Sequence, residues 1–104
     1  MNVPTYPLQL VKHLIATARR VITLSSQQSA GELGLDEQDI VECIATLAER
    51  CFYKSMQSEK RPGTWQDVYR PTFAGFDLYV KVQIIGTSPN DTVVVISFKR
   101  SATI

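Results

Sequence analysis

Apolar residues recur at helical spacing in two segments of the N-terminal half of the chain. From about residue 7 to residue 18 they lie three and four positions apart, which predicts an amphipathic helix that starts near Pro7. A second stripe follows Asp36, whose carboxylate is suited to cap a helix. We therefore expect two main helices, each burying one face. The two stripes are Leu10, Val11, Leu14, Ile15 and Ala18, and then Ile40, Val41, Ile44, Leu47 and Ala48.

The segment between these helices predicts two shorter elements. The stretch "RVITLS" (20–25) is short and rich in β-branched residues, which favours a strand. Ser29 and Glu32 have the spacing of a capping box, so "AGELGL" (30–35) predicts one or two helical turns that end at Gly34. The order so far is helix, strand, helix, helix.

In the C-terminal half the apolar period changes from 3.6 residues to two, which predicts strands. "FAGF" (73–76) and "GTSPND" (86–91) contain turn-forming residues between them. The chain is therefore expected to form a single α+β domain over residues 1–104, with helices packed on one face of a twisted antiparallel sheet. The alternating stretches are "WQDVYRPTF" (65–73), "FDLYVKVQII" (76–85) and "TVVVISFKR" (92–100).

The segment from residue 51 to residue 64 connects the helical half to these strands. Cys51 and Phe52 are expected to leave the second main helix toward the core. The stretch "SEKRPG" (58–63) is expected to form a mobile basic loop.

The alternation of the strands sorts their residues onto two faces. Two apolar sets are expected under the helices: Leu78, Val80, Val82 and Ile84, and then Val94, Ile96 and Phe98. The opposite parity carries polar side chains. If the parity of Gln66 and Arg70 is also the open one, five residues form a cluster on an exposed sheet face. They are Gln66, Arg70, Tyr79, Lys81 and Lys99.

Charge is distributed unevenly between the two halves of the chain. Residues 1–50 carry four cationic and six acidic residues, whereas residues 51–104 carry seven cationic and four acidic residues, within a net charge of +1. The C-terminal half could therefore offer a positive patch to a polyanion. No export leader and no run of about 20 apolar residues is present, so we expect a cytoplasmic protein. Cys43 and Cys51 are expected to be reduced and structural.

The inventory of chemical groups excludes several classes of enzyme. The single histidine, His13, falls on the first helix, and metal-ligand spacing, a phosphate-binding glycine loop and a nucleophile elbow are all absent. What remains is lysine, arginine, tyrosine and glutamine. These groups suit a phosphodiester whose own 2′-hydroxyl is the nucleophile, and only RNA has that hydroxyl. No metal or cofactor is predicted.

The ordinary pKa of lysine limits the roles of the cations. At a pKa of about 10.4, lysine is neutral in only ~1 molecule in 2,500 at pH 7, so it can act as a general base only if that pKa is lowered. We therefore interpret Lys54, Lys81 and Lys99 as stabilisers of phosphate charge or as proton donors. Tyr79 could transfer a proton or stack on a base, and Gln66 could orient the phosphate or the 2′-hydroxyl. Two alternatives stay open, a face that binds RNA without cleaving it and a solvated face without function.

Several stretches, in this order and near these spacings, resemble the MqsR family of bacterial toxins. They are "AGELGL" (30–35), "FYKSM" (52–56), "WQDVYRP" (65–71), "LYVKV" (78–82) and "VVISFK" (94–99). The resemblance implies a RelE- and YoeB-like RNase-toxin fold. It also implies a metal-independent endoribonuclease that cleaves single-stranded mRNA without the ribosome, at GC-containing triplets such as GCU, and leaves a cyclic phosphate and a 5′-hydroxyl.

The matched motifs also imply site residues and partners. The catalytic positions fall on Lys54, Gln66, Tyr79 and Lys99, and further positions associated with activity fall on Tyr53, Met56 and Arg70. We assign these three to RNA binding, together with Lys81 from the polar cluster of the exposed sheet face. The expected partner is a cognate antitoxin, which in this family often carries a zinc module and a helix-turn-helix DNA-binding domain. DNA would then be contacted only through the antitoxin, and no membrane is expected to be involved. An interaction module acting in autoregulation, without catalysis, is the alternative.

Overall fold

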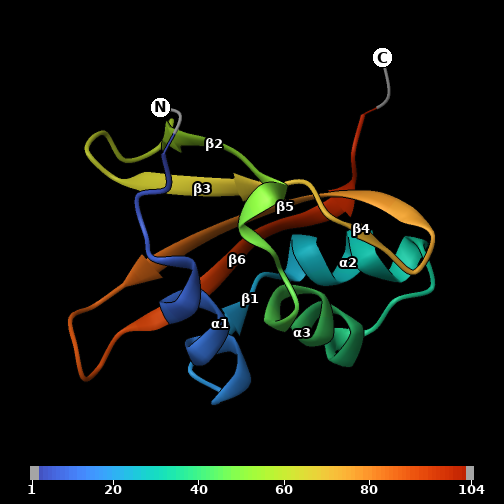
Figure 1. Cartoon of the computed structure of the whole chain (residues 1–104), viewed down its shortest axis with the longest axis horizontal. Helices are drawn as coiled ribbons and strands as arrows, with labels where there is room; N and C mark the ends of the chain where they lie inside the picture. Colours follow the sequence, from blue (N-terminus) through green and yellow to red (C-terminus); the bar gives the residue numbers. More distant parts are fainter. Residues whose placement is uncertain (1–2, 103–104) are drawn as a thin grey trace.

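A computed structural model describes residues 3–102, which form three helices, a short 3₁₀ turn and six strands (Figure 1). The helical elements are α1 (Leu8–Ala16), α2 (Leu24–Glu32), α3 (Glu37–Ala45) and η1 (Glu49–Cys51). The strands are β1 (Arg20–Ile22), β2 (Phe52–Gln57), β3 (Trp65–Tyr69), β4 (Thr72–Phe73), β5 (Phe76–Ile85) and β6 (Thr92–Arg100).

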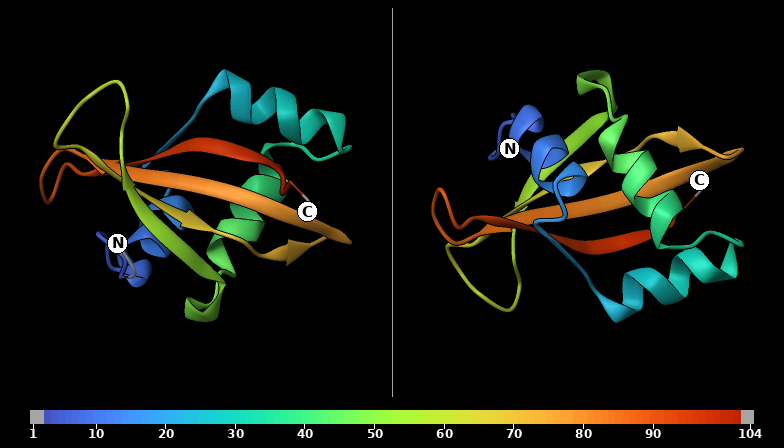
Figure 2. Two further views of the ribbon diagram at one scale, coloured as in Figure 1. Left: turned by 90° about the horizontal axis from the view of Figure 1, so that it is seen from above. Right: turned by 90° about the horizontal axis from the view of Figure 1, so that it is seen from below.

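The strands form one twisted sheet in the order β1-β6-β5-β3-β2, with β4 paired to β5. All pairs are antiparallel except β1 with β6, so the sheet is mixed. Figure 2 shows α1 and α3 lying across one face of the sheet, while α2 runs beside β6 beyond β1. The opposite face carries no described helix, and we call it the open face. The predicted α+β class, with helices on one face, is confirmed.

The core lies between the helices and the inner face of the sheet. Its fully buried residues include Val11, Leu14 and Ile15 from α1, Ile40 and Ile44 from α3, and Leu78, Val80 and Val82 from β5. In β6, however, Val93 and Val95 are buried, not Val94 and Ile96. The β5–β6 register shifts by one residue between Lys81 and Val82. A β-bulge at this shift reverses the parity within β6, so the prediction for Val94 and Ile96 was wrong while that for Phe98 is confirmed.

Two other predictions about elements were wrong. Helix α2 begins at Leu24, with the Thr23 hydroxyl accepting a hydrogen bond from Ser26 N, so Ser29 lies inside the helix and caps nothing. Cys51 and Phe52, predicted as the exit of the second main helix, instead end η1 and begin strand β2, because α3 stops at Ala45, although both pack against the core as expected. The cap at Asp36 is confirmed, because its carboxylate accepts from Asp39 N while the Asp39 carboxylate accepts from Asp36 N. The "FAGF" turn is also present, joining β4 to β5.

The N-terminal segment is tied to the inner side of β3 through Asp67. This fully buried carboxylate accepts hydrogen bonds from Thr5 N at 3.0 Å and from Tyr6 N at 2.9 Å. The Tyr6 hydroxyl donates to Trp65 O at 2.7 Å. Residues 5 and 6 thereby anchor β3 from its inner side, the side that faces the helices. Among the described residues, no helix has the length and apolar character needed to cross a bilayer.

Candidate active site on the open sheet face

The strand register brings the predicted site residues together in rows across the open face. One row runs from Ser97 through Lys81 and Val68 to Lys54, over strands β6, β5, β3 and β2. In the next row Lys99 lies opposite Tyr79. On the other side of the lysine row, Met56 lies opposite Gln66, whose amide Nε2 donates to Gln83 Oε1 at 3.2 Å. Within a row, neighbouring strands lie about 4.8 Å apart, and successive rows lie roughly 6.6 Å apart because the strand rises about 3.3 Å per residue, so one substrate could touch several rows.

A bulge in β2 explains how Lys54 reaches this face. The β2–β3 register shifts between Phe52 and Lys54, which leaves Tyr53 as an extra residue. Phe52 therefore packs inward on Tyr69, with ring centroids 5.6 Å apart, while Lys54 lies opposite the outward Val68. In a regular strand, residues 52 and 54 would share one face.

Two tyrosine rings on the open face are each approached by two cations. Tyr53 is approached by Lys54 Nζ at 5.4 Å and by Arg70 Cζ at 4.9 Å from the ring centroid. Tyr79 is approached by Lys81 Nζ at 5.8 Å and by Lys99 Nζ at 5.3 Å. Such cation–π contacts hold the cations beside the rings without neutralising their charge. The positive charge of both pairs therefore remains available to an anionic ligand.

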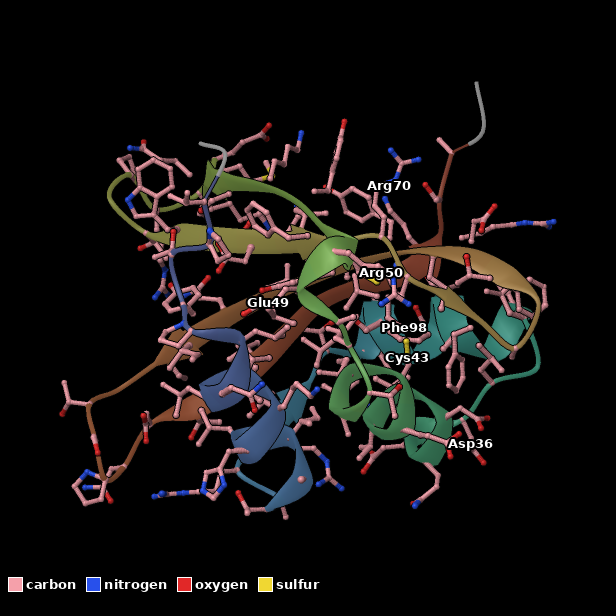
Figure 3. The ribbon with its side chains drawn as sticks, viewed as in Figure 1. Asp36, Cys43, Glu49, Arg50, Arg70 and Phe98 are labelled. Atoms are coloured by element: carbon pink, nitrogen blue, oxygen red, sulfur yellow. The ribbon has the colours of Figure 1, made fainter. Side chains whose placement is uncertain are left out.

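The Arg70 end of the open face continues into a hollow of about 350 Å³. Arg70 Nη2 donates to Ser101 Oγ at 3.0 Å, and Arg50 also lines the hollow. In Figure 3 the Arg70 side chain lies on the opposite side of the sheet from Phe98 and Cys43, which lie toward the helices. Sequence reasoning missed Arg50 and Ser101 because only the path of η1 and the end of β6 bring them near Arg70.

The open face perturbs the pKa of two of its groups in opposite directions. Burial lowers the pKa of Lys81, and the neighbouring Lys99 and Lys54 lower it further. Burial raises the pKa of Tyr79, with a smaller contribution from Tyr53. Lys81 therefore loses its proton more readily than a free lysine does, and the Tyr79 hydroxyl stays protonated at neutral pH.

All eight predicted site residues lie on the open face or at its edge. Val68, which lies between Lys54 and Lys81 in the lysine row, is closely packed. Val68 is fully buried although no described helix covers it, so neighbouring side chains must enclose it. Gln66 is only 8% exposed and is held by Gln83. Within residues 3–102, no three His, Cys, Asp or Glu side chains are grouped as a metal site would require. The open face therefore brings together the cationic side chains, the Tyr79 hydroxyl and the Gln66 amide.

Comparison with known proteins agrees with this arrangement of residues. A family model described as "Motility quorum-sensing regulator, toxin of MqsA" matches residues 3–100. The mRNA interferase toxin MqsR of Escherichia coli (strain K12) is 36% identical over 97 residues, which cover 93% of this chain and 94% of that protein. The family match spans the helices, the sheet and all eight predicted site residues. The chain therefore belongs to the MqsR toxin family.

Proposed function

We propose that this chain is an endoribonuclease toxin that cleaves single-stranded mRNA on its open face and thereby inhibits translation and growth. The observation that carries this proposal is the pair of tyrosine rings, each approached by two cations, on a sheet face that no described helix covers. Cations bind phosphates and tyrosine rings stack on unpaired bases, which together suit a single RNA strand. The relative from E. coli is named an mRNA interferase.

The reaction proposed is transphosphorylation within the RNA itself. The 2′-oxygen attacks the adjacent phosphorus, the bond to the 5′-oxygen breaks, and the products are a 2′,3′-cyclic phosphate and a 5′-hydroxyl. The protein then needs to move two protons and to stabilise the extra negative charge of the transition state. No step in this scheme requires a metal ion, so we expect activity in the presence of EDTA.

Each residue of the face has a role in this scheme. Lys54 and Lys99 stabilise the charge that develops on the phosphate, and Gln66 orients it. Tyr79, protonated at neutral pH, can give a proton to the leaving 5′-oxygen. The side chains expected to position the RNA strand are Tyr53, Met56, Arg70 and Lys81.

The family also provides expectations about specificity and partners. We propose that cleavage occurs without the ribosome at short GC-containing sequences such as GCU, and that a cognate antitoxin restrains the activity. The family description names these proteins as toxins of MqsA. The zinc module and the helix-turn-helix domain expected of the antitoxin are part of this proposal.

The test is cleavage of a mixed-sequence RNA by the purified chain in EDTA, with both new ends mapped. We expect 2′,3′-cyclic phosphate and 5′-hydroxyl ends at a small set of sequences. Lys99→Ala is the matched control, because it removes a charge that contacts Tyr79 at the open face. RNA that stays intact, or cleavage that needs added divalent ions, would overturn the proposal. Binding without cleavage would instead support the alternative of a non-catalytic RNA-binding face.

A further inference from the structure

Lys81 occupies the centre of the open face. It lies on β5, the middle strand in the order β1-β6-β5-β3-β2, between Ser97 on one neighbour and Val68 on the other. Lys54 follows Val68 in the same row, and Lys99 lies in the next row opposite Tyr79. Lys81 on β5 therefore lies between Lys54 on β2 and Lys99 on β6.

The surroundings of Lys81 differ from those of Lys99. Lys81 is half-buried, whereas Lys99 is exposed. Both ammonium groups contact the same ring, with Lys81 Nζ 5.8 Å and Lys99 Nζ 5.3 Å from the Tyr79 centroid. Two cations against one ring repel each other, and the more buried one gains most by losing its proton.

We propose that Lys81 is a catalytic residue, the general base that takes the proton of the attacking 2′-hydroxyl, and that Lys54 and Lys99 serve as fixed charges. This inference rests on the proposed ribonuclease function and deepens it. The placement carries it, because Lys81 is central, half-buried and beside Tyr79, the proposed acid, so one scissile phosphate can lie between base and acid.

The proposed step is balanced in protons and bonds. The neutral amine of Lys81 forms an N–H bond as the 2′-O–H bond breaks, and the 2′-oxygen then bonds to phosphorus. The bond from phosphorus to the 5′-oxygen breaks, and that oxygen takes the proton of the Tyr79 hydroxyl. Lys81 is left as an ammonium and Tyr79 as a phenolate, and both return to their starting state by proton exchange with water.

The charged groups around Lys81 agree with this assignment. Burial, Lys99 and Lys54 lower its pKa, and Glu59 from the β2–β3 loop acts in the opposite direction. Burial and Tyr53 raise the pKa of Tyr79. Arg70, which directly follows the neighbouring strand β3, adds a further positive charge to the same face. Groups whose pKa values are displaced in opposite directions are a common sign of an acid–base pair.

The test compares Lys81→Ala and Lys81→Arg with wild type in single-turnover RNA cleavage in EDTA over a range of pH. Arginine keeps the positive charge but cannot give up its proton, so it can replace a binding residue and not a base. We expect both variants to lose roughly 100-fold or more of the cleavage rate. We also expect Lys81→Arg to bind RNA as wild type does. The rise of the rate with pH, present in wild type, should be absent in Lys81→Ala.

Arg19→Ala serves as the control for loss of one positive charge, because residue 19 lies at the turn between α1 and β1. Its rate and pH profile should equal those of wild type. Lys81→Arg with near wild-type cleavage, or an unchanged pH profile in Lys81→Ala, would overturn the assignment of the base. If wild type itself cleaves no RNA in EDTA, the proposed function fails. If wild type and Lys81→Arg cleave equally, only this inference fails.

Discussion

At the scale of single residues, Tyr69 combines complete burial with an unpaired hydroxyl. Its side chain is 0% exposed, and its oxygen has no hydrogen-bond partner among the described residues. Burial raises its pKa to about 12, and Asp67 and Glu49 contribute to the rise. An unsatisfied buried hydroxyl costs stability, because in the unfolded chain it is hydrogen-bonded to water.

We expect Tyr69→Phe to leave the free energy of unfolding at neutral pH unchanged or to raise it by about 1 kcal/mol. Since the folded pKa is raised from 10.0 to about 12, the contribution of the neutral phenol is complete below pH 10 and is lost as pH rises toward 12. Urea unfolding at neutral pH and from pH 10 to 12 measures both effects. The variant should lose less stability in that alkaline range, and a slope equal to that of wild type would contradict the assignment.

The buried thiol of Cys43 is a second source of alkaline destabilisation. Burial, followed by Cys51 and Glu42, raises its pKa from 9.0 to about 12. Its contribution is complete below pH 9 and is lost as pH rises from 9 toward 12. It is common to wild type and Tyr69→Phe, so the difference between the two proteins reports on Tyr69 alone.

Tyr79 allows the hydroxyl and the ring to be tested separately. Tyr79→Phe keeps the ring that Lys81 and Lys99 contact and removes only the proposed proton donor. We expect it to lower the single-turnover rate by about 100-fold while RNA affinity changes little. Tyr79→Ala should lower both rate and affinity. A Tyr79→Phe variant that cleaves at the wild-type rate would remove Tyr79 from the acid role.

At the scale of elements, regular alternation could be predicted from the sequence and its interruptions could not. The predicted parity of Gln66, Tyr79 and Lys99 is confirmed because each lies in a regular run of strand, and Arg70 directly follows such a run. Lys54 could not be placed by parity, because a bulge at Tyr53 inserts one residue, and the same bulge hides the alternation of β2. A second bulge reverses the parity of Val94 and Ile96. Only the resemblance of "FYKSM" (52–56) to the family predicts Lys54 as a site residue; the strand periodicity does not.

Strand β3 depends on its buried carboxylate, which leads to a stability prediction. Asp67→Ala leaves the amides of Thr5 and Tyr6 without their acceptor. We expect a loss of about 2 to 3 kcal/mol in the free energy of unfolding, measured by urea denaturation. Asp77→Ala is the matched control, because Asp77 is exposed and accepts one bond from Thr72 Oγ1. Equal effects in the two variants would contradict the anchoring role of Asp67.

At the scale of the whole molecule, the face opposite the helices concentrates positive charge in a chain of nearly zero net charge. Lys54, Arg70, Lys81 and Lys99 lie there, while the formal net charge of the chain is only +1. Counterion release then predicts that log K for a single-stranded RNA falls with log salt with a slope of about −3 for four phosphate contacts. Lys54→Ala should reduce the slope by roughly 0.7, and Arg19→Ala should not change it. A slope near zero would contradict RNA binding on this face.

In the proposed function, the RNA substrate supplies its own nucleophile on the open face. The most direct measurement uses an RNA that carries a single 2′-deoxynucleotide on the 5′ side of a mapped cleavage site. The proposed function predicts that this RNA binds with unchanged affinity and is not cut at that position, while other sites are cut normally. Cleavage at the deoxynucleotide at the ordinary rate would contradict it.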